Sequence, residues 1–415
     1  MYNFHSEKIN WDLVNKELTE TDWLQHLDVN QVNCDQQYSN FLDKCLLVID
    51  KNLPSRNLNK KKFTIQRDRR ILMRKRKKLI KKNSQTRKSK EKFIDIELLL
   101  QESHKCERVK AELDASSKIK TNSKYFFSYA KRFSKTKPKI GPLTNPATKN
   151  LTSNSQEMAD ILQDQYCSVF TPPKLIDSAL DSNQTEENTL LEEIIFTEED
   201  IIREIDTINT TSAAGPDGLP AIFFKMCKKS LAKPLKIIWQ SNFNRGTTPL
   251  LLKTSHITPV FKSGDQGAPE NYRPVALTSI TSKIFEKIVR NKMHNYLEDK
   301  NLYNSTQHGF RPGRSCLSQL LAHVERLTFN LQNDENVDAI YLDFSKAFDK
   351  VDHAILLQKL QNIGIRGQLL NWLKSFLTER VQKVSVNTFL SYESTVISGV
   401  PQGLVLGYVQ FLIIL

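Results

Sequence analysis

Residues 341–353 read YLDFSKAFDKVDH. The apolar residues at its start are typical of a strand, and Asp343 is placed where this strand ends. Asp352 comes just before the apolar pattern HAILLQKL, where a carboxylate is suited to cap a helix. Asp349 fits equally a role beside Asp343 or a solvated surface. The stretch therefore predicts a strand that leads into a helix, with Asp343 at the strand end.

Composition divides the rest of the chain into three parts around this stretch. Residues 1–150 carry mostly helical patterns and include a basic run at 60–92. Residues 151–194 hold one more helix and a polar, acidic linker. From 195 to 415, strand patterns alternate with helix patterns. We therefore predict an α+β fold, in which a helical N-terminal half precedes a mixed domain.

Hydrophobic periodicity predicts individual elements within these parts. Strands are expected within 256–265, 271–279 and 338–351, and a hairpin over 381–397. Helices are expected over 93–132, 156–170, 196–208 with a cap at Thr197, and 281–301, and a loop is expected over 134–155. The residues expected to face inward on helices are Trp11, Val14, Leu18, Trp23, Leu24, Leu27, Ile284, Phe285, Ile288, Val289, Met293 and Leu297.

Several classes of protein are disfavoured by composition. The longest apolar stretch, VQFLIIL, is far shorter than the roughly 20 residues that cross a bilayer, and no secretion signal opens the chain. The 6 cysteines are scattered, without a C-x-x-C pair or a Cys/His set at zinc-ligand spacing. We therefore expect an intracellular protein of the nucleus or the cytoplasm, without membrane spans, zinc or disulfides.

Positive charge is concentrated in one segment. Residues 60–92 hold 17 Lys or Arg against 2 acids, a balance of +15, whereas the whole chain carries +14. Such a run can neutralise phosphates and bind nucleic acid in a salt-dependent way. A nuclear localisation signal and a solvated helix face remain alternatives. The candidate nucleic-acid contacts are Arg69, Arg70, Arg74, Lys75, Arg76, Lys77 and Lys78.

Four motifs, taken in order, resemble the reverse transcriptases of non-LTR retrotransposons, the jockey-like LINE elements. They are HITPVFKSGD with NYRPVALTSITSKIFEKIV, then QHGFRPGRS, then YLDFSKAFDKVDH, then SGVPQGLVLG. The loop SAAGPDGLP is also similar to that family. This resemblance implies an RNA-directed DNA polymerase that uses an RNA template, a DNA primer and dNTPs. It also implies that 195–415 form a right-hand polymerase with fingers and part of the palm.

The resemblance implies roles for the residues of the opening stretch. Asp343 and the carbonyl of Phe344 would be metal ligands in a catalysis that uses two Mg²⁺ ions, which prefer oxygen ligands. The turn Ser345, Lys346 and Ala347 would bring backbone N–H groups to the triphosphate. Phe348 would lie under the incoming sugar and exclude a 2′-hydroxyl, so that the product is DNA.

Further nucleotide-binding candidates come from the other motifs. Arg273 and Arg311 lie beside proline and glycine, on turns that can approach a ligand, and a guanidinium matches phosphate oxygens. Arg314 and Lys262 are weaker candidates, and a surface arginine is more often only solvated. Gln402 and Gly403 of GVPQG would contact the base pair formed by template and nucleotide.

The chain also departs from the family pattern. An aromatic-x-Asp-Asp motif is expected after GVPQG, but the sequence stops at Leu415 before it, and Leu404 stands where the family has serine. With the remaining metal carboxylates absent, we expect no polymerase activity from the polypeptide as given. Template-directed dNTP incorporation that Asp343→Ala abolishes would contradict this expectation. The alternative function is that of a non-catalytic remnant that binds nucleic acid through the basic run.

Overall fold

A computed structural model describes residues 2, 4, 6, 9–28, 33–54, 67–82, 86–121, 123–130, 140–172, 190–400, 403, 405–407, 409 and 413. The contacts group the chain into two units, of which the first is Met1–Arg56 with Ile140–Leu415 and the second is Asn57–Lys139. The predicted domain boundaries at 150 and 194 stay predictions.

Helices of the first unit surround a five-stranded sheet. Its helices are α1 (Trp11–Glu20), α2 (Trp23–Leu27), α3 (Cys34–Asn52), α7 (Ser155–Cys167), α8 (Glu198–Asp206), α9 (Ala221–Met226), α10 (Lys228–Asn244), α11 (Leu250–Lys253), η2 (Pro269–Asn271), α12 (Ile280–Asp299), α13 (Cys316–Gln332), α14 (His353–Asn362) and α15 (Gly367–Leu377). Its strands are β1 (Leu143–Thr144), β2 (Leu151–Thr152), β3 (Thr254–Phe261), β4 (Tyr272–Leu277), β5 (Arg380–Val386), β6 (Phe389–Leu390) and β7 (Ser394–Val396). The prediction of a mixed α and β fold is confirmed.

The main sheet joins segments that lie far apart in the sequence. β3 pairs with β4 in antiparallel fashion and with β5 in parallel fashion, and β5 also pairs with β6 and β7. The helix α7 packs on β5, where Met158, Leu162, Ile257 and Val384 form an apolar cluster. The predicted strands at 256–265 and 271–279 and the predicted hairpin are confirmed, with part of the expected loop forming the short hairpin β1–β2.

The N-terminal helices share the main core with the helices that follow residue 190. Val14, Leu18, Trp23 and Leu27 are buried, as predicted, and α1 to α3 contact α10. Leu24 is 61% exposed, so its inward placement was wrong. Because helical residues turn by about 100° per position, the neighbour of buried Trp23 points sideways and not into the core.

A buried carboxylate connects these N-terminal helices to the loop SAAGPDGLP. The Tyr38 hydroxyl of α3 donates a 3.0 Å hydrogen bond to Oδ2 of Asp217. Asp217 is 7% exposed, and burial raises its pKa from 3.8 to about 6. Since burial disfavours the ionised carboxylate, the folded chain holds its proton to a higher pH than the unfolded chain does.

We expect the free energy of unfolding to contain a contribution from Asp217 that falls as pH rises from about 4 to about 6. The unfolded carboxylate ionises first in this window, so stability is full below it and is reduced by about 3 kcal/mol above it. Urea unfolding at several pH values, with Asp217→Asn for comparison, measures the contribution. Parallel pH profiles for the two proteins would contradict the assignment.

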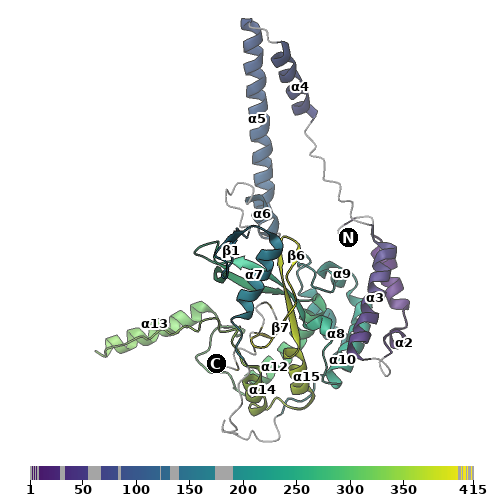
Figure 1. Ribbon diagram of the computed structural model, residues 1–415, viewed down its shortest axis with the longest axis vertical. Helices are drawn as coiled ribbons and strands as arrows, with labels where there is room; N and C mark the ends of the chain where they lie inside the picture. Colours follow the sequence, from purple (N-terminus) through teal and green to yellow (C-terminus); the bar gives the residue numbers. More distant parts are fainter. Residues whose placement is uncertain are drawn as a thin grey trace. The chain divides into compact units, whose positions relative to one another are not determined.

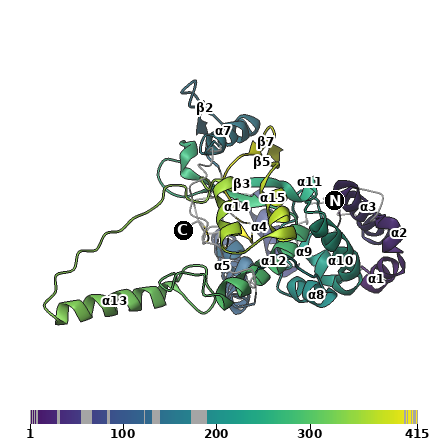
Figure 2. The same cartoon turned by 90° about the horizontal axis from the view of Figure 1, so that it is seen from below.

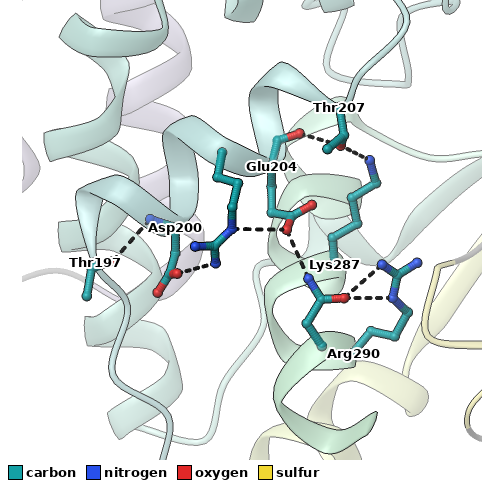
Figure 3. Close-up of polar contacts among 8 residues, drawn as sticks. Thr197, Asp200, Glu204, Thr207, Lys287 and Arg290 are labelled. Atoms are coloured by element: carbon teal, nitrogen blue, oxygen red, sulfur yellow. Dashed lines mark hydrogen bonds and ion pairs between the residues drawn. The ribbon is translucent and has the colours of Figure 1, made fainter. Parts of the chain in front are cut away.

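Polar contacts hold α8 against α12, as Figure 3 shows. Thr197 caps α8, as predicted, by accepting a 3.1 Å hydrogen bond from the Asp200 amide. The Asn291 side chain of α12 donates a 2.9 Å hydrogen bond to Glu204 of α8, and Lys287 of α12 donates to Thr207. All six residues that were predicted to face inward on α12 are buried. These hydrogen bonds therefore hold α8 and α12 together.

The predicted strand over 338–351 is not formed. Residues 335–344 have no regular structure, and Ile340, Tyr341 and Leu342 are 84%, 83% and 86% exposed. A strand needs a neighbour for its N–H and C=O groups, and no strand in the described residues pairs with this segment. The preceding helix α13 has no buried residue and lies apart from the sheet in Figure 2. The helix that follows is confirmed, because α14 begins after Asp352, which caps it.

The second unit consists of helices alone among its described residues. They are α4 (Arg67–Lys82), α5 (Arg87–Ser117) and α6 (Ser123–Ala130). The one helix expected over 93–132 is thus divided into two, and α4 lies beside α5 (Figure 1). No helix in the described part of either unit combines the length and the hydropathy that a membrane span requires.

Candidate active site

A cavity of about 700 Å³ lies beside the sheet of the first unit. The end of α7, the strands β3, β4, β5 and β7, and the segments 343–349 and 398–403 contribute to its wall. It thus joins three sequence motifs that are separated by many residues. The predicted residues that line it are Lys262, Arg273, Asp343, Phe344, Ser345, Lys346, Phe348, Asp349 and Gly403.

Residues 343–349 form a turn on one side of this cavity. Lys346 has a φ of 52°, and its carbonyl accepts a 3.0 Å hydrogen bond from the Asp349 amide. The turn exposes Asp343, Phe344 and Ser345, while Ala347 belongs to the turn without lining the cavity. Successive backbone N–H groups in such a turn can bind an anion.

Phe348 is held from outside the turn. Its ring lies edge-on against the ring of Phe310, with centroids 6.3 Å apart, and it packs against the main core. Phe310 belongs to the motif QHGFRPGRS, which otherwise lies away from the cavity. This contact fixes an aromatic surface at the cavity wall.

Residues 398–400 are hydrogen-bonded to the end of the turn and to Val351 just after it. The Val400 amide donates to the Phe348 carbonyl and the Gly399 amide to the Val351 carbonyl, both at 2.8 Å. The His353 ring bonds the Gly399 carbonyl at 2.8 Å, and burial lowers the pKa of His353. Gln402 lies outside the described residues.

Gly399 fits only without a side chain. Its φ is 86°, and an added Cβ would lie 2.7 Å from the Asp349 carbonyl oxygen. Backbone atoms cannot swing aside as the end of a long side chain can, so the close approach of the two segments depends on glycine.

Glu286 of α12 anchors the residues that follow Gly403. Its Oε2 accepts hydrogen bonds from the amides of Val405 at 2.8 Å and Leu406 at 3.3 Å, and its Oε1 accepts one from Ser282 at 2.9 Å. The carboxyl is fully buried, and burial raises the pKa of Glu286, whereas the buried Arg380 guanidinium opposes this shift. Glu286 was not predicted as a functional residue, because helical periodicity does not reveal a hydrogen bond to a distant loop.

The two arginine candidates have different surroundings. Arg273 is exposed on β4 and lines the cavity with Lys262. Arg311 instead donates to both carboxylate oxygens of Glu298, at 3.1 and 2.7 Å, and lies 4.9 Å from the ring centre of Tyr303. Arg314 donates to a backbone carbonyl at 2.6 Å. Of these guanidinium groups, the geometry therefore supports only Arg273 as a nucleotide contact.

A known protein family matches the part of the chain that contributes most of the cavity wall. The family described as "Reverse transcriptase (RNA-dependent DNA polymerase)" matches residues 260–415, which include all the predicted residues that line the cavity. This part of the chain is therefore similar to reverse transcriptases. The resemblance that the four motifs predicted is confirmed.

Relatives from retrotransposons also support the similarity to reverse transcriptases. Over 210 residues the chain is 27% identical to "Probable RNA-directed DNA polymerase from transposon BS" and 30% identical to "RNA-directed DNA polymerase from mobile element jockey", both of Drosophila melanogaster. Each alignment covers 50% of this chain and 23% of the relative. A third relative, "Probable RNA-directed DNA polymerase from transposon X-element" of the same species, is 32% identical over 38% of this chain and 18% of its own. The chain thus spans less than a quarter of these relatives.

Two polar side chains of the cavity wall were missed by the sequence analysis. The Tyr166 hydroxyl of α7 and Nε2 of Gln382 on β5 are buried, and neither has a hydrogen-bond partner among the described residues. Burial raises the pKa of Tyr166 well above its usual value, and the Asp349 carboxylate adds to this. Tyr166 precedes the region 260–415 that matches the reverse transcriptase family, and the pattern of residues 156–170 predicted only a helix.

The region 260–415 offers few metal ligands among its described residues. No group of three or more His, Cys, Asp or Glu side chains is placed there to hold an ion, although Asp343 and Asp349 both line the cavity. Mg²⁺ is commonly held by one or two carboxylates, with waters and substrate phosphates as further ligands. The donor set therefore fits Mg²⁺ that arrives together with a nucleotide.

The basic candidates lie in the second unit, outside the region 260–415 that matches the reverse transcriptase family. Arg69 is 4% exposed and is engaged by α5, and Arg76 forms an ion pair with Glu97. The other five are exposed: Arg70, Arg74, Lys75, Lys77 and Lys78. The seven residues that the charge count grouped together therefore have two kinds of surroundings.

Proposed function

We propose that this chain supplies the nucleotide-binding part of an RNA-directed DNA polymerase of a non-LTR retrotransposon. The observation that carries the proposal is the single cavity in which cations, a carboxylate, a tight turn and an aromatic ring meet. In this proposal, residues 195–415 are the fingers and part of the palm. Its substrates are dNTPs, an RNA template and a DNA primer, whose 3′-hydroxyl forms a bond to the α-phosphorus as pyrophosphate leaves.

The triphosphate would lie between β4 and the turn 343–349. Arg273 and Lys262 bring positive charge to the cavity, and a guanidinium can bind two phosphate oxygens at once. On the other side, the turn at Ser345, Lys346 and Ala347 presents backbone N–H groups. The two sets of donors would fix the phosphates and so orient the α-phosphorus.

Asp343, with the Phe344 carbonyl beside it, would hold Mg²⁺ jointly with the phosphate oxygens. When bound, the ions of a two-metal site activate the attacking hydroxyl and stabilise the leaving oxygens. Asp343 is exposed at the cavity wall, where a nucleotide can reach it. Its task in this proposal is to place the metal and the phosphates together.

Phe348 would distinguish deoxynucleotides from ribonucleotides. The contact with Phe310 and the packing against the core restrain its ring. A restrained ring next to the sugar cannot move aside for an additional hydroxyl, because interiors are closely packed. Gly403, which lies over the Ala276 carbonyl of β4, would let the backbone approach the base pair.

Binding of a fluorescent dNTP analogue with Mg²⁺, followed by anisotropy, tests the proposal on the 415-residue chain. We expect Arg273→Gln to weaken binding about 10- to 100-fold, since a charged hydrogen bond to phosphate contributes roughly 1.5 to 3 kcal/mol.

Arg311→Gln is the matched control, because it removes the same charge from a guanidinium that Glu298 already binds. It is expected to change affinity by less than about threefold. An equal loss in both variants, or no loss in Arg273→Gln, would show that the cavity is not the nucleotide site.

A further inference from the structure

Arg69 and Arg76 of α4 face α5 and bind it. On α4, Arg69, Leu72, Arg76 and Leu79 follow each other at intervals of three or four residues, so they share the face toward α5. The Arg69 guanidinium donates to Ser103 Oγ at 3.1 Å and to the Ser103 carbonyl at 2.9 Å, and it pairs with Glu107. With the pair formed by Arg76 and Glu97, these contacts fix the antiparallel register of the hairpin.

The opposite face of α4 carries most of the other positive charges of this helix. With about 100° per residue, six cations lie within about 60° of the line directly opposite α5. All six are exposed, and this set, named the outer basic stripe, is Arg67, Arg70, Arg74, Lys77, Lys78 and Lys81. Asp68, the acid of this helix, lies on the side toward α5. From Arg67 to Lys81 the stripe is about 21 Å long, at about 1.5 Å per residue.

A row of cations without an acid matches a polymer with regularly spaced negative charges. A membrane surface would also attract it, but a helix that lies in a bilayer needs a free apolar face opposite its cations. In α4 the face opposite the stripe packs on α5 through Arg69 and Arg76. Of the exposed apolar residues, Ile71 lies on one side of the helix and Met73 and Ile80 lie on another, so they do not form one free apolar face. Charge complementarity with phosphates remains as the recognition available to this helix.

We propose that the outer basic stripe binds the phosphate backbone of nucleic acid, independently of base sequence, as a site separate from the nucleotide cavity. The structure thereby divides the basic run into cations that build the hairpin and cations that contact the polymer. Arg67 and Lys81 join the contact set, whereas Arg69 and Arg76 leave it, and Lys75 lies to the side of the stripe.

Anisotropy of a fluorescent 20-mer duplex and a 20-mer single-stranded RNA, titrated at several KCl concentrations, tests this site. The stripe variant combines Arg70→Gln, Arg74→Gln, Lys77→Gln and Lys81→Gln. We expect it to lose at least about 30-fold in affinity at 0.1 M salt and to flatten the slope of log K against log salt for the duplex by about 3.6.

The control removes four exposed lysines of the first unit, by Lys229→Gln, Lys233→Gln, Lys236→Gln and Lys292→Gln. Both variants lower the formal charge from +14 to +10, so a difference between them reports the position of the charges. Retained affinity in the control, with unchanged helical circular dichroism in both, supports the proposal.

Equal losses in the two variants would overturn the proposal, since net charge alone would then explain binding. Wild-type affinity in the stripe variant would overturn it as well. Vesicles with phosphatidylserine form a third arm, and binding to them in preference to nucleic acid would assign the stripe to membranes instead. Binding of the fluorescent dNTP should be unchanged in the stripe variant, so failure of this site is distinguishable from failure of the cavity proposal.

Discussion

Glu286→Leu is expected to lower the free energy of unfolding of the first unit by about 3 to 5 kcal/mol, the usual effect of removing one partner from a buried charged network. The substitution leaves the amides of Val405 and Leu406 and the Ser282 hydroxyl without their acceptor. It also leaves the buried Arg380 guanidinium, which is 1% exposed, without the Glu286 carboxylate whose negative charge stabilises this cation. Urea unfolding followed by tryptophan fluorescence measures the change, since Trp239 and Trp372 are buried in the same core.

A second substitution separates the charge effect from a simple packing defect. Burial lowers the pKa of Arg380 to about 10, which shows how unfavourable its surroundings are for a cation. Removing it together with Glu286, as Glu286→Leu with Arg380→Met, should therefore restore part of the lost stability. Additive losses in the double variant would mean that the two charges do not act on each other.

Gly399→Ala is expected to cost at least about 3 kcal/mol of stability, because a left-handed backbone and a steric overlap act together. The new Cβ would lie 2.7 Å from the Asp349 carbonyl and 2.8 Å from the Phe348 carbonyl. Either the loop or the turn must move, so weaker dNTP binding should accompany the loss. The same urea titration and the anisotropy assay measure both effects.

Gly313→Ala provides the comparison for Gly399. Gly313 has a φ of 73°, but nothing lies within 4 Å of the position of an added Cβ. Its substitution should cost only the backbone strain, about 1 kcal/mol. If the two alanine variants were equally stable, the close approach at Gly399 would not be the constraint.

Local patterns predicted much of the fold. The six inward residues of α12 and the caps at Thr197 and Asp352 depend on neighbours within a few positions. Hydrophobic periodicity and capping residues make such local contacts visible in the sequence. The strands β3 and β4 follow each other in the chain and pair with each other. The failed strand at 338–351 depends on a pairing partner that no local pattern can supply.

The site was predictable in its motifs but not in its geometry. Sequence alone placed Arg273 and Arg311 on equal terms, and only their neighbours distinguish them, since Glu298 binds Arg311. The contact of Phe310 with Phe348 and the bond from Glu286 to Val405 join residues that lie many positions apart. In the basic run, counting charges could not show that Arg69 faces α5.

The backbone hydrogen bonds that Gly399 and Val400 form with the turn region affect which substitutions this sequence tolerates. Val400 donates to the Phe348 carbonyl and Gly399 to the Val351 carbonyl, from main chain to main chain. Such bonds do not depend on which side chains the partners carry, so the exposed Lys350 can accumulate substitutions while the two segments stay joined. Val400 is buried in the main core and is constrained by packing instead. At Gly399 and Gly403, where a backbone carbonyl leaves no space for a side chain, glycine is required, and mutational tolerance should therefore be far lower at these two positions than at Lys350.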